Sequence, residues 1–210
     1  MGHDLRVSLE IMRTAYIGMG GNLASWAGAP EATLTAAALR LESLGRVVCR
    51  SSLYSTAPVG FAAQPRFVNA VVALETELEP RELLEGLLAI EQEFGRERAA
   101  GFVNGPRMLD LDILLLGDME ISEPGLEIPH PRLAERAFVL IPLNEIAAEI
   151  LVPGRGETVA QLVVSQISKA RPGAPGLLEG SNNSESDAVV RVQSDAWVVS
   201  HVSKARPGSP

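Results

Sequence analysis

Residues 108–116 read Met-Leu-Asp-Leu-Asp-Ile-Leu-Leu-Leu, an apolar run interrupted by two aspartates. A run of this length and composition predicts a β-strand. Because successive side chains of a strand point to opposite faces, Asp110 and Asp112 are expected to project from one face, with the neighbouring leucines and isoleucine on the other. Their two Cα atoms would lie about 6–7 Å apart.

The aspartate pair indicates a metal site. Two converging carboxylates do not both stay ionised unless a positive charge lies between them. Their hard oxygen atoms suit Mg²⁺, often as two ions that substrate phosphates bridge. The alternative is a strand whose polar face is simply solvated. Aspartate is disfavoured in strands, and this favours a functional role for the pair.

The elements that precede this strand place it last in a familiar order. Hydrophobic periodicity and turn residues predict strands over 15–18, 46–55 and 67–77 and helices over 30–44 and 80–94. The order strand, helix, strand, strand, helix, strand matches the split β-α-β arrangement. We therefore expect the α+β class, specifically a ferredoxin-like βαββαβ sandwich with an antiparallel sheet and helices packed on one face.

Three local features complete this prediction. The glycines at 18–21 predict a turn that ends the first strand and lets another chain segment or a ligand approach it. Residues 137–150 are expected to be helical, with a break or bend at Pro142. Cys49 is the single cysteine, which rules out an intramolecular disulfide, and it is expected to be a small buried hydrophobe.

The chain divides into a lead over 1–13, a domain over 14–164 and a tail over 165–210. The tail is dense in Ser, Gly, Pro and Asn over its first part. Residues 164–175 return as residues 199–210, with nine of twelve positions identical. Two copies are too few for a solenoid.

The tail has more than one interpretation. A flexible segment with an internal duplication is the plainest one, and it predicts that residues 170–195 are mobile and dispensable. The alternatives are a short strand that pairs with the edge of the sheet, or a tag that binds a partner.

Composition limits the possible functions. With 46% hydrophobic and 21% charged residues in 210, the chain is expected to be globular, and wholesale disorder is excluded. The net charge of −8 argues against a general nucleic-acid or anionic-membrane binder. No apolar stretch is long enough for a membrane span, and the lead does not look like a secretory signal. A cytoplasmic location is expected.

The positive charges are almost all arginine. Sixteen of the 18 cations are Arg, and residues 1–168 contain no lysine, so neither a Schiff-base lysine nor a phosphate-loop lysine exists there. Phosphates would be bound by arginine, backbone amides and metal. The arginines gather around 96–107 and directly after His130, which lies between two prolines. The alternatives are solvated surface arginines and a structural loop histidine.

Several motifs occur in a fixed order and together resemble one family. They are Ala15–Leu23, Ser51–Gly60, Phe67–Ala70, Glu91 with Gly95-Arg96-x-Arg98, Gly105–Leu114, Pro129–Pro131 and Arg136–Leu143. The chain resembles the 6-hydroxymethyl-7,8-dihydropterin pyrophosphokinases of folate biosynthesis over about residues 14–163. It departs from the family pattern over 99–104, which lack the basic residues and the Trp that many members carry before the Gly-Pro-Arg motif.

The resemblance implies an enzyme that transfers a diphosphate from ATP to the hydroxymethyl group of the pterin and releases AMP. Asp110 and Asp112 would hold two Mg²⁺ ions, and Asp112 would also help to accept the hydroxyl proton. Arg96 and Arg107 would be catalytic cations of a mobile loop that closes over the phosphates. Such a transfer needs mainly positioning and neutralisation of charge.

The resemblance also implies the binding residues. Thr56 and Val59 would bind the pterin through backbone groups, Asn69 would bind it through its amide, and Phe67 and Phe138 would sandwich the ring. The implied ATP-binding residues are Glu91, Arg98, Arg107, Ile113, His130 and Arg136.

Two other classes of function stay open at this point. One is a catalytically silent module that binds nucleotide or pterin on the same fold. The other is an RNA-binding ferredoxin-like domain, against which the acidic balance and the aromatic content of 4% speak. The expected partners are small molecules, without nucleic acid or membrane, and a monomer is expected.

Overall fold

The computed structural model describes residues 11–58, 63–95, 105–169, 189–192 and 197. The α-helices are α1 Pro30–Arg40, α2 Pro80–Glu93, α3 Ala137–Ala147 and α4 Val159–Lys169, with short 3-10 turns at Leu41–Ser43 and Leu133–Glu135. The strands are β1 Arg13–Gly21, β2 Arg46–Arg50, β3 Leu53–Thr56, β4 Phe67–Thr76, β5 Asp110–Leu116, β6 Ile121–Glu123, β7 Leu126–Ile128 and β8 Val190–Val192.

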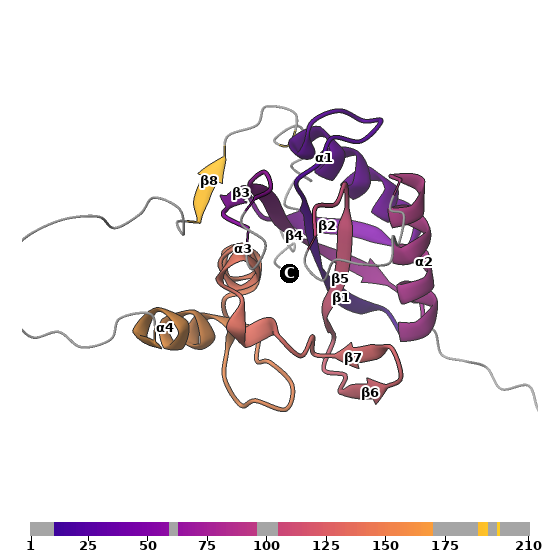
Figure 1. The fold of residues 1–210 in the computed structure, drawn as a ribbon. Coiled ribbons are helices and arrows are strands. Elements are labelled where there is room, and N and C mark those ends of the chain that lie inside the picture. Colours follow the sequence, from indigo (N-terminus) through magenta and orange to yellow (C-terminus); the bar gives the residue numbers. More distant parts are fainter. Residues whose placement is uncertain (1–10, 59–62, 96–104, 170–188, 193–196, 198–210) are drawn as a thin grey trace, which may run out of the picture.

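One antiparallel sheet organises the domain. Its strand order is β5-β1-β4-β3-β8, and β2 also pairs with β4, beside β3 (Figure 1). Every pairing in it is antiparallel. Strands β6 and β7 form a separate hairpin. The prediction of an α+β fold with an antiparallel sheet is therefore confirmed.

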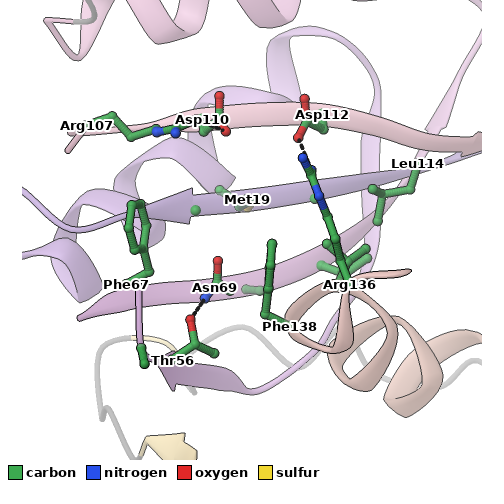
Figure 2. A pocket seen from close by; sticks show the side chains of 16 residues that line it. Met19, Thr56, Phe67, Asn69, Arg107, Asp110, Asp112, Leu114, Arg136 and Phe138 are labelled. Atoms are coloured by element: carbon green, nitrogen blue, oxygen red, sulfur yellow. Dashed lines mark hydrogen bonds and ion pairs between the residues drawn. The ribbon is translucent and has the colours of Figure 1, made fainter. Parts of the chain in front are cut away.

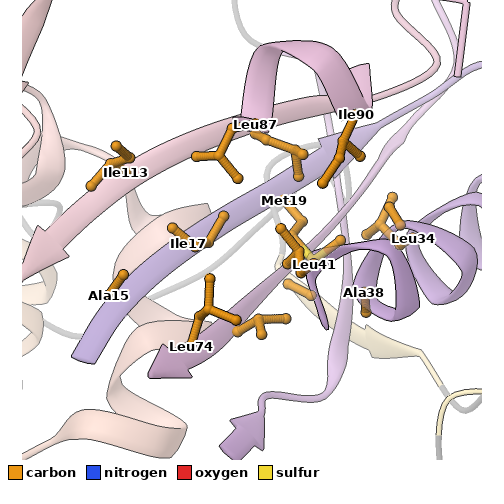
Figure 3. Close-up of a cluster of buried hydrophobic side chains, with 14 of the residues drawn as sticks. Ala15, Ile17, Met19, Leu34, Ala38, Leu41, Leu74, Leu87, Ile90 and Ile113 are labelled. Atoms are coloured by element: carbon orange, nitrogen blue, oxygen red, sulfur yellow. The ribbon is translucent and has the colours of Figure 1, made fainter. Parts of the chain in front are cut away.

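Helices cover both faces of this sheet, so the prediction of helices on one face is wrong. On one face α1 and α2 pack on alternate residues of β1, such as Ile17, to form the larger core (Figure 3). On the other face α3 packs over Val71 and Leu114, and α4 packs against α3 (Figure 1). The reason is that the helices after β5 have apolar stripes of their own, which only the second face can bury.

Two predicted local features differ in the β1 and β2 regions. Strand β1 continues through its glycines to Gly21 instead of ending in a turn. The predicted strand over 46–55 is split because the Ser51 hydroxyl, rather than a backbone carbonyl, accepts the N–H of Val71 (2.9 Å). The burial of Cys49 was predicted wrongly. A register shift between Val47 and Cys49 leaves this thiol exposed, since a bulge re-aims the side chains that follow it.

The region after β5 holds most of the unpredicted structure. Helix α3 runs through Pro142, so no break occurs there. The hairpin β6–β7 turns at Pro124-Gly125, a turn signal visible in the sequence. Helix α4 crosses the predicted domain boundary at residue 165.

The described part of the tail adopts the edge-strand alternative. Strand β8 pairs with β3, with Tyr54 opposite Arg191. Trp197 is buried, with 8% of its surface exposed. The rest of the segment over 170–195 lies outside the described residues, so its mobility stays a prediction.

Gly95 offers a test of how α2 ends. Its φ is +87°, which side chains disfavour, and an added Cβ would lie 2.9 Å from Met108 Sδ. Gly125 has a similar φ of +77° but open space around it. We predict that Gly95→Ala lowers the free energy of unfolding by about 1–3 kcal/mol, and more than Gly125→Ala does. Urea denaturation measures both, and equal losses would contradict a role for the Met108 contact.

Candidate functional site

A cavity opens on the face of the sheet that α3 covers only in part (Figure 2). Its lining comes from β1, β4, β5, the end of β3 and the start of α3. The predicted site residues that line it are Thr56, Phe67, Asn69, Arg107, Asp110, Asp112, Arg136 and Phe138. Residues that are far apart in the sequence are thus brought together, as the resemblance implies.

Glycines make this cavity possible. Strand β1 lies between β5 and β4, with Gly20 paired to Asp110 on one side and to Asn69 on the other. A Cβ on Gly20 would lie 3.0 Å from Asn69 Oδ1. One pair further along, a Cβ on Gly18 would lie 3.2 Å from a methyl carbon of Leu114. The glycines therefore form a floor without side chains, in keeping with their predicted role in close approach.

The two aspartates share the cavity face, as predicted. Asp110 and Asp112 are half-buried, while Leu111 and Ile113 are buried on the opposite face. Each carboxylate faces an arginine. Arg107 Nη1 lies 2.6 Å from an oxygen of Asp110, and Arg136 Nη1 lies 3.9 Å from an oxygen of Asp112. These cations offset the repulsion between the carboxylates.

Backbone contacts fix the start of β5 against the end of β1. The Arg107 carbonyl accepts the N–H groups of Asn22 (2.9 Å) and Leu23 (3.1 Å). The Asn22 side-chain oxygen in turn accepts the Arg107 N–H (2.9 Å). Asn22 is 3% exposed, so this pairing lies in a protected environment. It holds Arg107 at the rim of the cavity.

The opposite wall carries polar and aromatic groups. Asn69 Nδ2 donates to the Thr56 hydroxyl (2.8 Å) in a buried pair. The Arg107 guanidinium lies over the Phe67 ring, 5.8 Å from the centre of that ring. The Arg136 guanidinium lies 5.7 Å from the centre of the Phe138 ring. The site thus offers amide, hydroxyl and aromatic surfaces on one side and charges on the other.

A second cavity borders β5 and is lined in part by residues of the opposite face of this strand. Ile113, His130 and the β6–β7 hairpin line it, and Asp112 lines both cavities. The first measures about 100 Å³ and the second about 400 Å³. Among the described residues, Asp112 is the one that the two linings share.

His130 is held in one tautomer. Its Nδ1 accepts the N–H of Arg132 (3.1 Å), so a neutral ring carries its proton on Nε2. Burial chiefly lowers the pKa of His130, and the charges of Arg136 and Arg132 lower it further, while Asp110 raises it. His130 is thus a neutral donor beside the second cavity.

Not every predicted residue reaches a cavity. Glu91 is 1% exposed and lines neither one. Its carboxylate accepts the N–H of Leu111 (2.7 Å), between the two aspartates. In this position it holds β5, and its role in ATP binding stays a prediction. Val59, Arg96 and Arg98 lie outside the described residues.

Several lining residues could not be recognised from the sequence. Leu114 and Val139 line the first cavity, and Leu84 and Leu126 line the second. Apolar residues of this kind are common in any core, so their pattern carries no functional signal. The Pro124-Gly125 turn was the one visible clue to the hairpin beside the second cavity.

The donor set at the aspartates fits Mg²⁺. No group of three or more His, Cys, Asp or Glu side chains that could hold a metal ion occurs among the described residues. Two carboxylates on one face are still sufficient for Mg²⁺, which commonly takes one or two protein carboxylates and completes its shell with water and substrate phosphates.

No helix in the described part is long and apolar enough to cross a membrane.

Comparisons with known proteins agree on one family. A family model described as 7,8-dihydro-6-hydroxymethylpterin-pyrophosphokinase (HPPK) matches residues 16–148. A 2-amino-4-hydroxy-6-hydroxymethyldihydropteridine pyrophosphokinase from Pseudomonas aeruginosa is 44% identical over 145 residues, 68% of this chain and 86% of that protein. A protein of the same name from Methylorubrum extorquens is 41% identical over 162 residues, 75% of this chain and 99% of that protein.

A solved structure shows the same fold. It is the crystal structure of a triple mutant of Plasmodium falciparum HPPK-DHPS, with a TM-score of 0.61 and 17% identity over 78% of this chain. The present chain spans less than half, 46%, of that longer one. At this identity the likeness concerns the fold alone.

His130 predicts a pH dependence of stability. Its folded pKa lies below the ordinary value of 6.5, so below that pH the unfolded chain binds the proton more readily. The contribution of His130 to stability is present above the unfolded pKa and is lost as the pH falls through and below it. We expect the Tm of the native chain to fall more steeply than that of His130→Asn between about pH 7.5 and pH 5. Parallel Tm curves would contradict this.

Proposed function

Because this chain belongs to the 7,8-dihydro-6-hydroxymethylpterin-pyrophosphokinase family, we propose that it transfers a diphosphate from ATP to 6-hydroxymethyl-7,8-dihydropterin in folate biosynthesis. The single observation that carries this proposal is the position of Asp112, which lines both cavities. If each cavity binds one substrate, Asp112 lies beside the position at which the diphosphate is transferred between them.

The first cavity suits the pterin. The ring is flat and carries hydrogen-bonding groups along its edge. Phe67 and Phe138 supply aromatic faces, and the Asn69–Thr56 pair supplies both donors and acceptors. We assign these four residues to pterin binding, together with the backbone of Val59.

The second cavity suits ATP. It is the larger of the two and includes Ile113 and His130. The Nε2–H of a neutral His130 can donate to the nucleotide, and the arginines beside Asp110 and Asp112 can bind its phosphates. We assign Ile113, His130, Arg107, Arg136 and Arg98 to this substrate. The Glu91 carboxylate holds β5 in position by accepting the backbone N–H of Leu111.

Mg²⁺ would bind at Asp110 and Asp112, and we propose two ions. When bound, Mg²⁺ neutralises charge on the phosphates and lowers the cost of bringing them to the acidic strand. Arg107 and Arg136 are already next to these carboxylates, so the same arginines are within reach of phosphate oxygens that approach the site.

The proposed chemical step is a single displacement. The hydroxymethyl oxygen of the pterin attacks the β-phosphorus of ATP, and the bond from that phosphorus to the oxygen of the α-phosphate breaks, so AMP leaves. The hydroxyl proton passes to a base, a role we assign to Asp112. Arg107 and Arg96 serve as catalytic cations that stabilise the charge of the transferred group and exclude water.

Three finer assignments belong to the same proposal. The strand order β5-β1-β4-β3 supports the ferredoxin-like classification. A monomeric state and a cytoplasmic location are proposed from the sequence. Sedimentation and cell fractionation measure the last two directly.

Asp112→Asn tests the proposed site. The change keeps the shape of the side chain and removes its charge, so AMP formation should fall by at least about a hundredfold. Asp118→Asn, on the exposed turn after β5, is the control and should leave the rate unchanged. AMP release in a coupled assay, with and without the pterin, measures both.

The results of this assay separate the alternatives. Unchanged AMP release in Asp112→Asn would refute the assignment of the site. If the native chain binds both substrates in calorimetry but forms no AMP, it is a silent binding module.

Phe138→Ala tests the first cavity by itself. Loss of the ring surface should raise the KM for the pterin by about tenfold, while the KM for ATP changes little. Phe138→Tyr keeps the ring and is the matched control, so it should stay near the native value. Equal rises in both KM values would place Phe138 outside the pterin site.

A further inference from the structure

The C-terminal segment continues the sheet that carries the site. Strand β8, Val190–Val192, covers the outer edge of β3, a strand of only four residues. Thr56, the last residue of β3, lines the first cavity. Without β8, β3 would be a short edge strand with few contacts of its own, so its position depends on what lies on each side.

Two rows of residues lead from the aspartates to this segment. In the first row Asp110 pairs with Gly20, Gly20 with Asn69, Asn69 with Tyr54, and Tyr54 with Arg191 of β8. These residues lie on the cavity face of five successive strands. A shift of β3 would therefore move the neighbours of Asn69 directly.

The second row ends at Trp197. Asp112 pairs with Gly18 and Gly18 with Val71, and Ser51 exchanges hydrogen bonds with Val71. The indole N–H of Trp197 then donates to the Ser51 carbonyl (2.6 Å), in a buried bond. The Arg50 guanidinium lies 5.5 Å from the indole ring centre. Trp197 belongs to the core on the α1 face, so it anchors the segment from that side.

Glu145 fastens the same edge from the α3 side. Its carboxylate accepts the N–H (2.8 Å) and hydroxyl (2.7 Å) of Ser52 and the hydroxyl of Tyr54 (3.0 Å). Arg191 lies 3.4 Å from it. Burial and the hydrogen bond to Glu145 raise the pKa of Tyr54, so this hydroxyl remains a donor at neutral pH. Helix α3, which carries Phe138 at its start, is thus joined to β3 and β8.

We propose that β8 and Trp197 form a positioning element for the pterin site. They hold β3 in register between the Glu145 network and the core, and so hold the Thr56–Asn69 pair in the geometry that binds the ring. The inference rests on the proposed function and extends it to a segment outside the residues that the family model matches, 16–148. The second cavity shares no residue with β3 or β8, so ATP binding should be independent of this element.

Three full-length variants test the proposal. Trp197→Ala removes the anchor, Trp197→Phe keeps a ring but removes the N–H donor, and Arg191→Gln removes the link to Glu145. We expect the KM for the pterin to rise about tenfold in the first variant and about threefold in the second, with the KM for ATP within about twofold of native. The effect of Arg191→Gln should be smaller, because exposed ion pairs are weak.

Arg46→Gln is the matched control. Arg46 pairs with Glu75, with side-chain exposures of 69% and 29%, against 67% and 30% for Arg191 and Glu145. This pair lies on β2 and β4, away from the first cavity, so the control should leave both KM values unchanged. A purely structural effect of losing an arginine would lower the Tm of both variants without moving the KM for the pterin.

A second measurement, hydrogen exchange, uses the thermodynamic linkage between pterin binding and the stability of β8. If β8 favours pterin binding, the pterin must stabilise β8 to the same extent. Adding the pterin alcohol should slow hydrogen exchange over Leu53–Thr56 and Val190–Val192 in the native chain, and less so in Trp197→Phe. The exchange rates need no catalytic turnover, so they are informative even if Trp197→Ala does not fold.

The outcomes are distinct. A pterin KM within twofold of native in folded Trp197→Phe and Trp197→Ala, or exchange unaffected by the pterin, overturns the positioning role. An equal rise in both KM values also overturns it. Absence of AMP formation by the native chain would instead refute the proposed function, and pterin-dependent exchange would then still decide whether the segment is coupled to the cavity.

Discussion

The absence of side chains at Gly18 and Gly20 of β1 is the constraint on which the site depends. Gly18 and Gly20 lie between the aspartates of β5 and the polar and apolar side chains of β4. A methyl group at either position would come within 3.0–3.2 Å of Asn69 or Leu114. The sheet can therefore have a cavity at its centre, where most sheets are filled by side chains.

The two faces of the sheet have different tasks. Helices α1 and α2 seal one face with a continuous apolar core, which fixes the strands relative to each other. Helix α3 covers only part of the other face, and its first turn brings Phe138 and, just before it, Arg136 over the glycine floor. Rigidity on one side thus supports an open, polar site on the other.

The charge distribution explains how an acidic chain can handle an anionic substrate. The net charge of −8 is spread over the whole chain, whereas the site pairs each of two aspartates with an arginine. Local charges at a few ångströms outweigh distant ones that water screens. The overall charge is therefore a poor guide to the ligand, and the local pairs are a good one.

Much of the fold was predictable, and the failures share a cause. The strand over 108–116 and both early helices follow from periodicity, because period 2 or 3.6 reflects burial of one face. The exposure of Cys49 was missed because a one-residue bulge reverses the alternation. The edge strand β8 was predicted only as one alternative for the tail. A segment of three residues is too short for hydrophobic periodicity to distinguish a strand from a loop.

The sequence by itself determined the chemistry of the groups and their local direction: two carboxylates on one face of a strand, arginine in place of lysine, and glycines that permit close approach. Only the tertiary structure decided what these groups meet. It placed Asp112 between two cavities, turned Glu91 inward to hold Leu111, and brought Trp197 to the carbonyl of Ser51. The reason is that backbone periodicity acts over a few residues, whereas these contacts join segments 20 to 146 residues apart, whose pairing depends on how the whole sheet and its helices pack.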